Sequence, residues 1–258
     1  GEEPGTIQTQ RKYTRPSPIS INGGISFPAT IINGTYPNFN SLFNYAKYGN
    51  YFPMTFVHYC GDGRQYYNCR VASFSFSVVA GDVLNISSDI YSKFFDSISS
   101  DVAILFDTYL DTPFKTSEKI ITFDQVHLEI LDSDSSTFTT DAIQGLELEI
   151  NNNLTEIYTA KPTGVATVQT MGSENHDANL FPRDLRLGMQ EISGTISIYI
   201  AQGVDFLTIS TKRLKLKLTV SNFSTEINCV LQPKQINGIV GPVIISIPFV
   251  GVDKALGD

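Results

Sequence analysis

The sequence has no tryptophan, only three cysteines and three histidines, and few cations for its size. The 18 Lys and Arg residues are outnumbered by 26 Asp and Glu residues, which gives a formal net charge of −8 at pH 7. A nucleic-acid-binding surface needs clustered cations that displace counterions from phosphates, so this balance argues against specific DNA or RNA binding. His58, His127 and His176 are far apart and lack metal-ligand spacing. We therefore predict no metal site and no other cofactor.

The chain also lacks a long apolar run, a signal-peptide pattern and a Gly-x-Ser-x-Gly nucleophile elbow. A membrane helix needs about 20 mostly apolar residues, so we expect no stable membrane insertion. Residues 132–136 resemble half of a calcium loop, but Ile143 occupies the position that requires a glutamate. Glu147 and Glu149 resemble a glycosidase pair in spacing, although a solvated strand face is the favoured interpretation. None of these candidate patterns meets the requirement of a catalytic site, so we predict that the protein is not an enzyme.

Cys60 and Cys69 flank a Gly-Asp-Gly turn and are a candidate disulfide across a hairpin. Two reduced thiols near a turn are the alternative, because the odd third cysteine, Cys229, argues against a secreted disulfide framework. A zinc site is disfavoured, since no C-x₂-C knuckle is present.

Hydrophobic residues make up 41% of the chain, and the aromatic residues are 17 Phe and 12 Tyr. This composition supports a packed core and excludes a disordered chain. Apolar and polar residues alternate with period two, as expected for strands that bury one face of an antiparallel sheet. The clear cases are residues 72–78, 146–150, 192–200 and 213–220, and weaker ones are 83–90, 102–107, 123–131 and 243–249.

The fold class predicted from this pattern is all-β: an antiparallel sandwich or barrel with one or two short helices and long loops. Residues 37–46 are the predicted helix, because Phe39, Phe43 and Ala46 would share one side with Leu42. We expect residues 1–17 to form an extended arm and residues 18–258 a single domain. The stretch 159–188 lacks alternation and is predicted to be a long loop that serves a partner or a function.

Charged residues alternate along several predicted strands. Arg213, Lys215 and Lys217 form a cationic stripe, whereas Glu147 and Glu149 form an anionic one. Such stripes can pair across strands within one sheet, or they can pair between subunits and fix their register. Solubility alone is the third interpretation.

With these segments in order, the chain resembles the tail tube proteins of long-tailed bacteriophages. The resemblance covers roughly residues 65–255 and rests on short motifs. They are an alternating strand with an Asn-rich turn leading to a Tyr (143–158), the Phe-Pro-Arg-Asp connection (181–184), a Glu-x-Ser-Gly-x-Ile strand (188–200), an early strand pair (68–90) and a closing strand (243–253). The 159–187 insertion departs from the family pattern.

The resemblance implies a virion structural protein whose inner sheet joins its neighbours in a ring, with hexameric rings stacked into a tube around a DNA lumen. It also implies assembly in the host cytoplasm, with tape measure, terminator or baseplate proteins as partners, and DNA that passes without specific binding. Arg183 and Asp184 are then a candidate ring-stacking loop, and the charged stripes are candidates for the lumen or for subunit contacts. A distal tail or baseplate ring component and a carbohydrate-binding or adhesin module are the alternatives.

Overall fold

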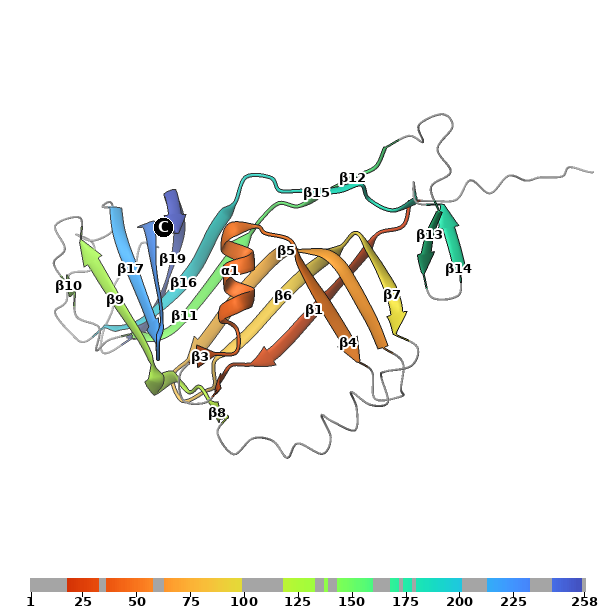
Figure 1. Cartoon of the computed structure of the whole chain (residues 1–258). Coiled ribbons are helices and arrows are strands. Elements are labelled where there is room, and N and C mark those ends of the chain that lie inside the picture. The colour runs from red at the N-terminus through yellow and green to blue at the C-terminus, as the bar shows by residue number, and fades with distance from the viewer. Residues whose placement is uncertain are drawn as a thin grey trace, which may run out of the picture.

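The structure, a computed structural model, describes residues 18–32, 36–57, 63–98, 118–132, 137–138, 143–159, 168–171, 174–177, 180–200, 213–232 and 243–256. Within these ranges the chain is mostly β-strand, with one α-helix and little 3-10 structure (Figure 1). The predicted all-β fold class is therefore confirmed. The arm at 1–17 and the strand at 102–107 lie outside the described residues, so both stay predictions, as does the division at residue 17.

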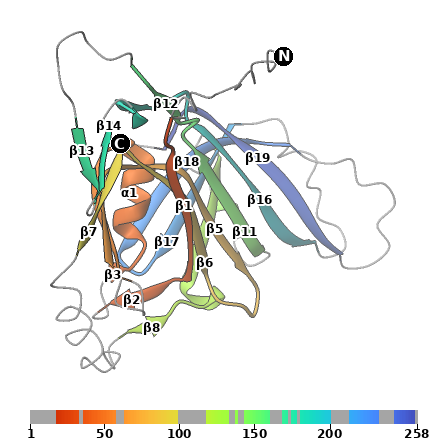
Figure 2. The same cartoon turned by 90° about the vertical axis from the view of Figure 1, so that its right-hand side faces the viewer.

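Most strands belong to one antiparallel sheet that curls into a half-barrel (Figures 1 and 2). Its spatial order is β1 (Ile21–Pro28), β6 (Asn85–Ser92), β5 (Gly63–Val79), β11 (Ile143–Asn151), β16 (Glu191–Ile200), β19 (Val243–Leu256), β18 (Phe223–Leu231), β17 (Arg213–Val220), β9 (Val126–Asp132) and β10 (Thr137–Phe138), with β4 (Phe52–Val57) and β7 (Phe94–Ile98) paired to β5 off this path.

Smaller sheets lie around the large one. They are β2 (Thr30–Ile32) with β3 (Tyr36–Pro37) and β8 (Lys119–Ile120), the ribbon β12 (Thr155–Ile157) with β15 (Asp184–Arg186), and the pair β13 (Val168–Met171) with β14 (Glu174–Asp177). The 3-10 turn η1 (Phe123–Gln125) leads into β9. Strands β13, β14 and β15 fall inside the predicted loop at 159–188, where strands of three or four residues are too short for alternation to be detected.

Alternation along the strands gives the large sheet one buried and one open face. The apolar members of β5, β6, β11, β16, β17, β18 and β19 form a single buried cluster. The largest fully buried side chains are Phe39, Phe74, Phe76, Phe249, Leu84, Ile86, Ile121, Leu148, Ile150, Leu185, Ile196 and Ile198. Removing such area from water contributes about 25 cal/mol per Å², so this cluster is the main source of stability.

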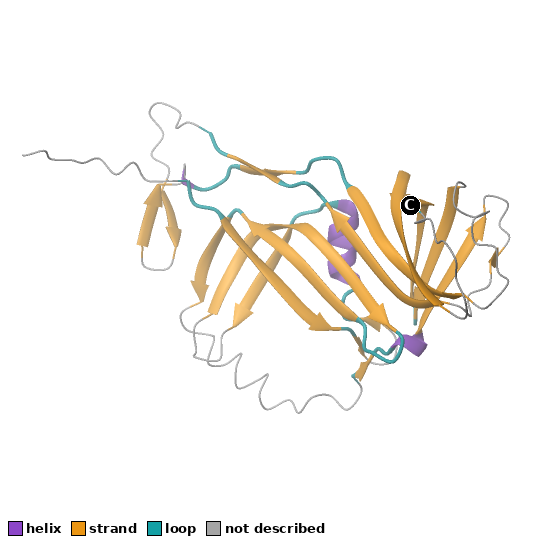
Figure 3. Ribbon diagram, turned by 180° about the vertical axis from the view of Figure 1, so that it is seen from behind, coloured by secondary structure: helices purple, strands orange, loops and turns teal. Residues whose placement is uncertain are grey.

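Helix α1 (Asn40–Tyr48) lies between the two arms of the curled sheet (Figures 1 and 3). Phe43 makes edge-to-face contacts with Phe74 of β5 and Phe223 of β18, at centroid distances of 5.6 and 4.9 Å. One aromatic side chain of the helix thus joins both arms of the sheet. The helix begins later than the predicted 37–46 and ends at Gly49, whose φ of 63° favours glycine.

Candidate functional site

The open face of β6, β5, β11 and β16 carries small polar and acidic side chains, and we call it the acidic face. Its members are Asn85, Ser87 and Asp89, then Ser73, Ser75 and Ser77, then Glu147, Glu149 and Asn151, then Glu191, Ser193, Thr195 and Ser197. The local cause is alternation, because the residues between these side chains, such as Phe74, Leu148 and Ile192, are buried.

Strand register arranges these side chains in rows across the sheet. One row runs from Ser87 through Ser75 and Glu149 to Ser193. Hydrogen bonds tie the β5 and β6 members together, because the hydroxyls of Ser75 and Ser87 are 2.6 Å apart and Ser73 donates to the Asp89 carboxylate at 2.9 Å. The surface is therefore a serine ladder with carboxylates beside it.

The carboxylates of Glu147 and Glu149 differ from the other strand charges in their surroundings. Both are exposed, and no ion pair joins either to a residue that the structure describes. Of the four strands of this face, β6, β11 and β16 contain no Lys or Arg, whereas β5 contains Arg64 and Arg70 outside its serine-bearing segment. Among the described residues, no ion pair therefore compensates the charge of these two carboxylates.

The open face of β9, β17 and β18 has the opposite character, and we call it the paired face. Lys217 of β17 lies 3.3 Å from the Glu129 carboxylate of β9, and Lys215 lies 2.9 Å from that of Glu226 on β18. The cationic stripe predicted from the sequence is thus placed between two acidic strands of the same subunit. Arg213, at the start of β17, is exposed and is opposite Val230.

Asp184 belongs to a separate cluster on the β12–β15 ribbon. The Tyr51 hydroxyl donates a hydrogen bond to its carboxylate, and Lys93 forms an ion pair with it at 3.6 Å. The hydrogen bond from Tyr51, followed by the nearby Lys93 charge, lowers the pKa of Asp184. The Tyr51 ring also contacts the Arg70 guanidinium, 3.9 Å from its centroid. This cluster fixes the ribbon to the top of β5, whereas the neighbouring Arg183 is exposed.

Asn152 connects this end of the sheet to the helix. Its buried side-chain amide donates to the carbonyls of Ala46 and Val71 at 2.9 Å each, and it accepts a hydrogen bond from Gln190 at 2.8 Å. A buried amide with all these partners holds the last turn of α1 against β5 and the start of β16.

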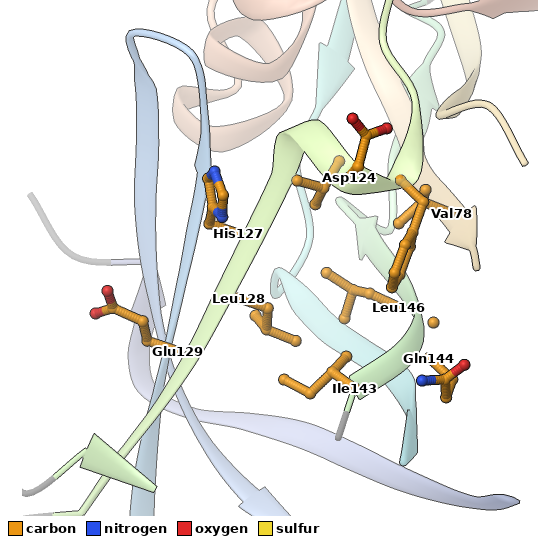
Figure 4. A pocket seen from close by; sticks show the side chains of 11 residues that line it. Val78, Asp124, His127, Leu128, Glu129, Ile143, Gln144 and Leu146 are labelled. Carbon is orange, nitrogen blue, oxygen red and sulfur yellow. The ribbon is translucent and has the colours of Figure 1, made fainter. Parts of the chain in front are cut away.

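A cavity of about 400 Å³ opens between β9 and β11 (Figure 4). Leu128, Ile143 and Leu146 point into it, while Glu129 points to the other side of β9 (Figure 4). His127 is exposed. In the part of the chain that the structure describes, no three His, Cys, Asp or Glu side chains gather as metal ligands.

The predicted site residues thus fall into three places. Glu147 and Glu149 lie on the acidic face, the three β17 cations on the paired face, and Arg183 and Asp184 on the ribbon. Cys69 is buried in β5, where burial raises the pKa of its thiol. Cys60 lies outside the described residues, so the disulfide stays a prediction.

Four residues of these surfaces were not predicted from the sequence. Asp89 and Glu191 join the acidic face, and both have the alternating signal that could have revealed them. Tyr51 and Lys93 had no such signal, because their contact with Asp184 depends on tertiary structure.

A family model described as phage tail tube protein matches residues 8–251. A search of curated proteins finds no match. Among the described residues, no helix is long and apolar enough to cross a membrane.

Proposed function

Because the chain belongs to the phage tail tube protein family, we propose that its copies close into hexameric rings whose stack forms the tube for DNA ejection. The family is a structural one, not an enzyme family, and its members are components of the virion tail. The number six follows from the family resemblance. The proposed partners are other copies of the chain and the tape measure, terminator and baseplate proteins at the tube ends.

The acidic face supports this proposal most directly, and we propose that it lines the lumen. DNA carries one negative charge per about 1.7 Å of its axis, so a lumen that carries Glu147 and Glu149 without counter-cations repels the phosphates. The serine ladder adds short hydroxyls beside these carboxylates. A duplex can then slide along the face without binding to it.

The curled sheet supports ring closure. It ends at β1 on one side and at the two-residue β10 on the other, so it is a half-barrel with edges. Exposed edge strands pair readily with other chains, and closing a barrel between subunits removes them. An interface whose rotation closes generates a ring.

The paired face is proposed to lie away from the lumen. Its carboxylates Glu129 and Glu226 are matched by Lys217 and Lys215, so it presents little net charge to DNA. Its outward neighbours are solvent or other tail proteins.

Electron microscopy of the purified protein and of assembled tails tests the rings. Rings that stack into tubes are the expected result, and a stable monomer at high concentration with no rings in tails would refute the proposal.

Two matched variants test the lumen. Ser193→Lys adds one cation to the acidic face, whereas Ser224→Lys adds one to the paired face, and both serines are exposed. We expect Ser193→Lys tails to assemble but to eject DNA more slowly at low salt, and Ser224→Lys tails to eject normally. Equal ejection rates for the two variants would show that the acidic face does not line the lumen.

A further inference from the structure

Strand β16 has an exposed apolar side chain near each of its ends. Met189, two residues before the strand, is 77% exposed, and Tyr199, near its end, is 42% exposed. Tyr199 is directly opposite Ile244 of β19, which is 58% exposed. Val79 of β5 is 54% exposed at the same end of the sheet. Val79 and Tyr199 continue the alternation of Ser77 and Ser197, so they lie at one end of the acidic face, and Ile244 lies beside Tyr199 there. We call Val79, Tyr199 and Ile244 the apolar ledge.

Register and hydrogen bonds assign Met189 and the ledge to opposite ends of the half-barrel. Gln190, next to Met189, donates to the Ala46 carbonyl in the last turn of α1. At the other end, Val79 is opposite Gly145 of β11, and the backbone of Ala80 bonds to Gln144. Figure 2 shows the two ends of β16 separated by the length of the strand. Ten residues of strand span about 30 Å.

The Met189 end carries exposed cations. Arg183 and Arg186 are exposed on the β12–β15 ribbon, and the Gly188 amide next to Met189 bonds to Asn152. Of the carboxylates nearby, Asp184 is matched by Lys93. Glu156, Glu191 and, in the same cross-strand row as Glu191, Asp89 are further described acids at this end.

The ledge end carries exposed acids. Asp82 lies in the turn between β5 and β6, and its carbonyl accepts a hydrogen bond from Phe123, which brings Asp124 of η1 beside it. Glu118 precedes β8, where Lys119 is the described cation of this end. Cations of one end therefore find acids at the other when two copies stack head to tail.

We propose that Met189 of one copy packs on Tyr199 and Ile244 of a copy in the next ring, and that this contact joins rings into a tube. The inference rests on the proposed function, because it concerns a stack of rings. A head-to-tail contact needs two different surfaces on one molecule, and repetition along an axis makes a filament. A thioether against an aromatic ring is a favourable contact, and Met adapts to irregular surfaces. Charge complementarity at the two ends selects this orientation over head to head.

Single substitutions separate stacking from folding. Met189→Asp adds a charge at an exposed position, so the fold and the rings should persist. Loss of one apolar anchor should weaken the association of rings by roughly tenfold or more, seen as short tubes or free rings. Val250→Asp is the control, because it adds the same charge to an exposed apolar residue in the middle of β19. It should leave tube length unchanged.

Cross-linking tests the contact itself. In a Cys60→Ser background, the double variant Met189→Cys with Ile244→Cys should give a ladder of disulfide-linked chains under oxidation, while each single variant should not. Cys69 and Cys229 are buried and serve as internal thiols that do not react.

Four outcomes are distinguishable. Free rings with Met189→Asp together with the ladder support the inference. Tubes of normal length with Met189→Asp and no ladder overturn it while leaving the tube function intact. If the unmodified protein forms no rings at all, both the proposed function and this inference fail. If Met189→Asp is unfolded by circular dichroism, the cross-linking result decides.

Discussion

The acidic face and the paired face belong to the same sheet and cover the same core, but they differ in whether their charged side chains face opposite charges on neighbouring strands. On the paired face, Lys217 is directly opposite Glu129 on one side and Glu226 on the other. On the acidic face, Glu149 is opposite Ser75 and Ser193. The strands of both faces alternate equally well. Neighbouring strands therefore decide whether a stripe of charge is neutralised or displayed.

The difference indicates separate roles for the two halves. A stripe of charges that is paired across strands helps to hold β9, β17 and β18 in register. A stripe without such pairs does not stabilise the subunit in this way, and its charges can act on DNA or on a partner protein. Glu147 and Glu149 form no ion pair with any residue in the described ranges, which fits a surface that must repel phosphate.

The largest effect should come from the core beneath the two faces. Leu148 underlies the acidic face and Leu216 the paired face, and both are buried. Changing either to Asp should destabilise the fold by at least about 4 kcal/mol, because a charge would be buried without a partner. Thermal melting followed by circular dichroism measures this. If one variant lost only half of its circular dichroism signal, the parts of the sheet under the acidic face and under the paired face would not share one core.

A smaller effect is expected on the paired face. Lys217→Ala removes one partner of an exposed ion pair, which should cost about 0.2–1 kcal/mol. Urea titration of Lys217→Ala, Glu129→Gln and the double variant gives their coupling energy. A coupling of zero, or one that does not weaken at high salt, would contradict the assigned pairing.

On the acidic face, removing a charge should increase the stability of the fold instead of lowering it. Glu149→Gln removes repulsion from Glu147, about 7 Å away along the strand, and should raise stability by about 0.5 kcal/mol or less. The same urea titration measures it, with the gain disappearing in high salt. A loss of stability would reveal a cation near Glu149.

The smallest effect concerns Asp184, whose side chain is 51% exposed. Its lowered pKa means that folding gains stability from this carboxylate above its ordinary value of 3.8, and loses the gain as pH falls through the folded value. Asp184→Asn should therefore melt lower than the unmodified chain near neutral pH and at the same temperature in strong acid. A difference in melting temperature that is the same at all pH values would contradict a lowered pKa of Asp184.

Much of the fold was predictable because it depends on local pattern. Period-two alternation indicated the strands at 146–150 and 213–220 and which of their residues are buried. Phe39 and Phe43 at helical spacing indicated α1. The short strands of residues 168–186 were not predictable, because three or four residues do not establish a period.

The sequence by itself determined that Glu147 and Glu149 share one open face, and that Lys215 and Lys217 share another. Only the tertiary structure decided that the lysines are neutralised within the subunit, because Lys217 meets a carboxylate 88 positions away in the chain. It also decided that Tyr199 lies directly opposite Ile244 of β19. Alternation is a property of one strand, whereas register and strand order depend on how distant segments pack on a common core.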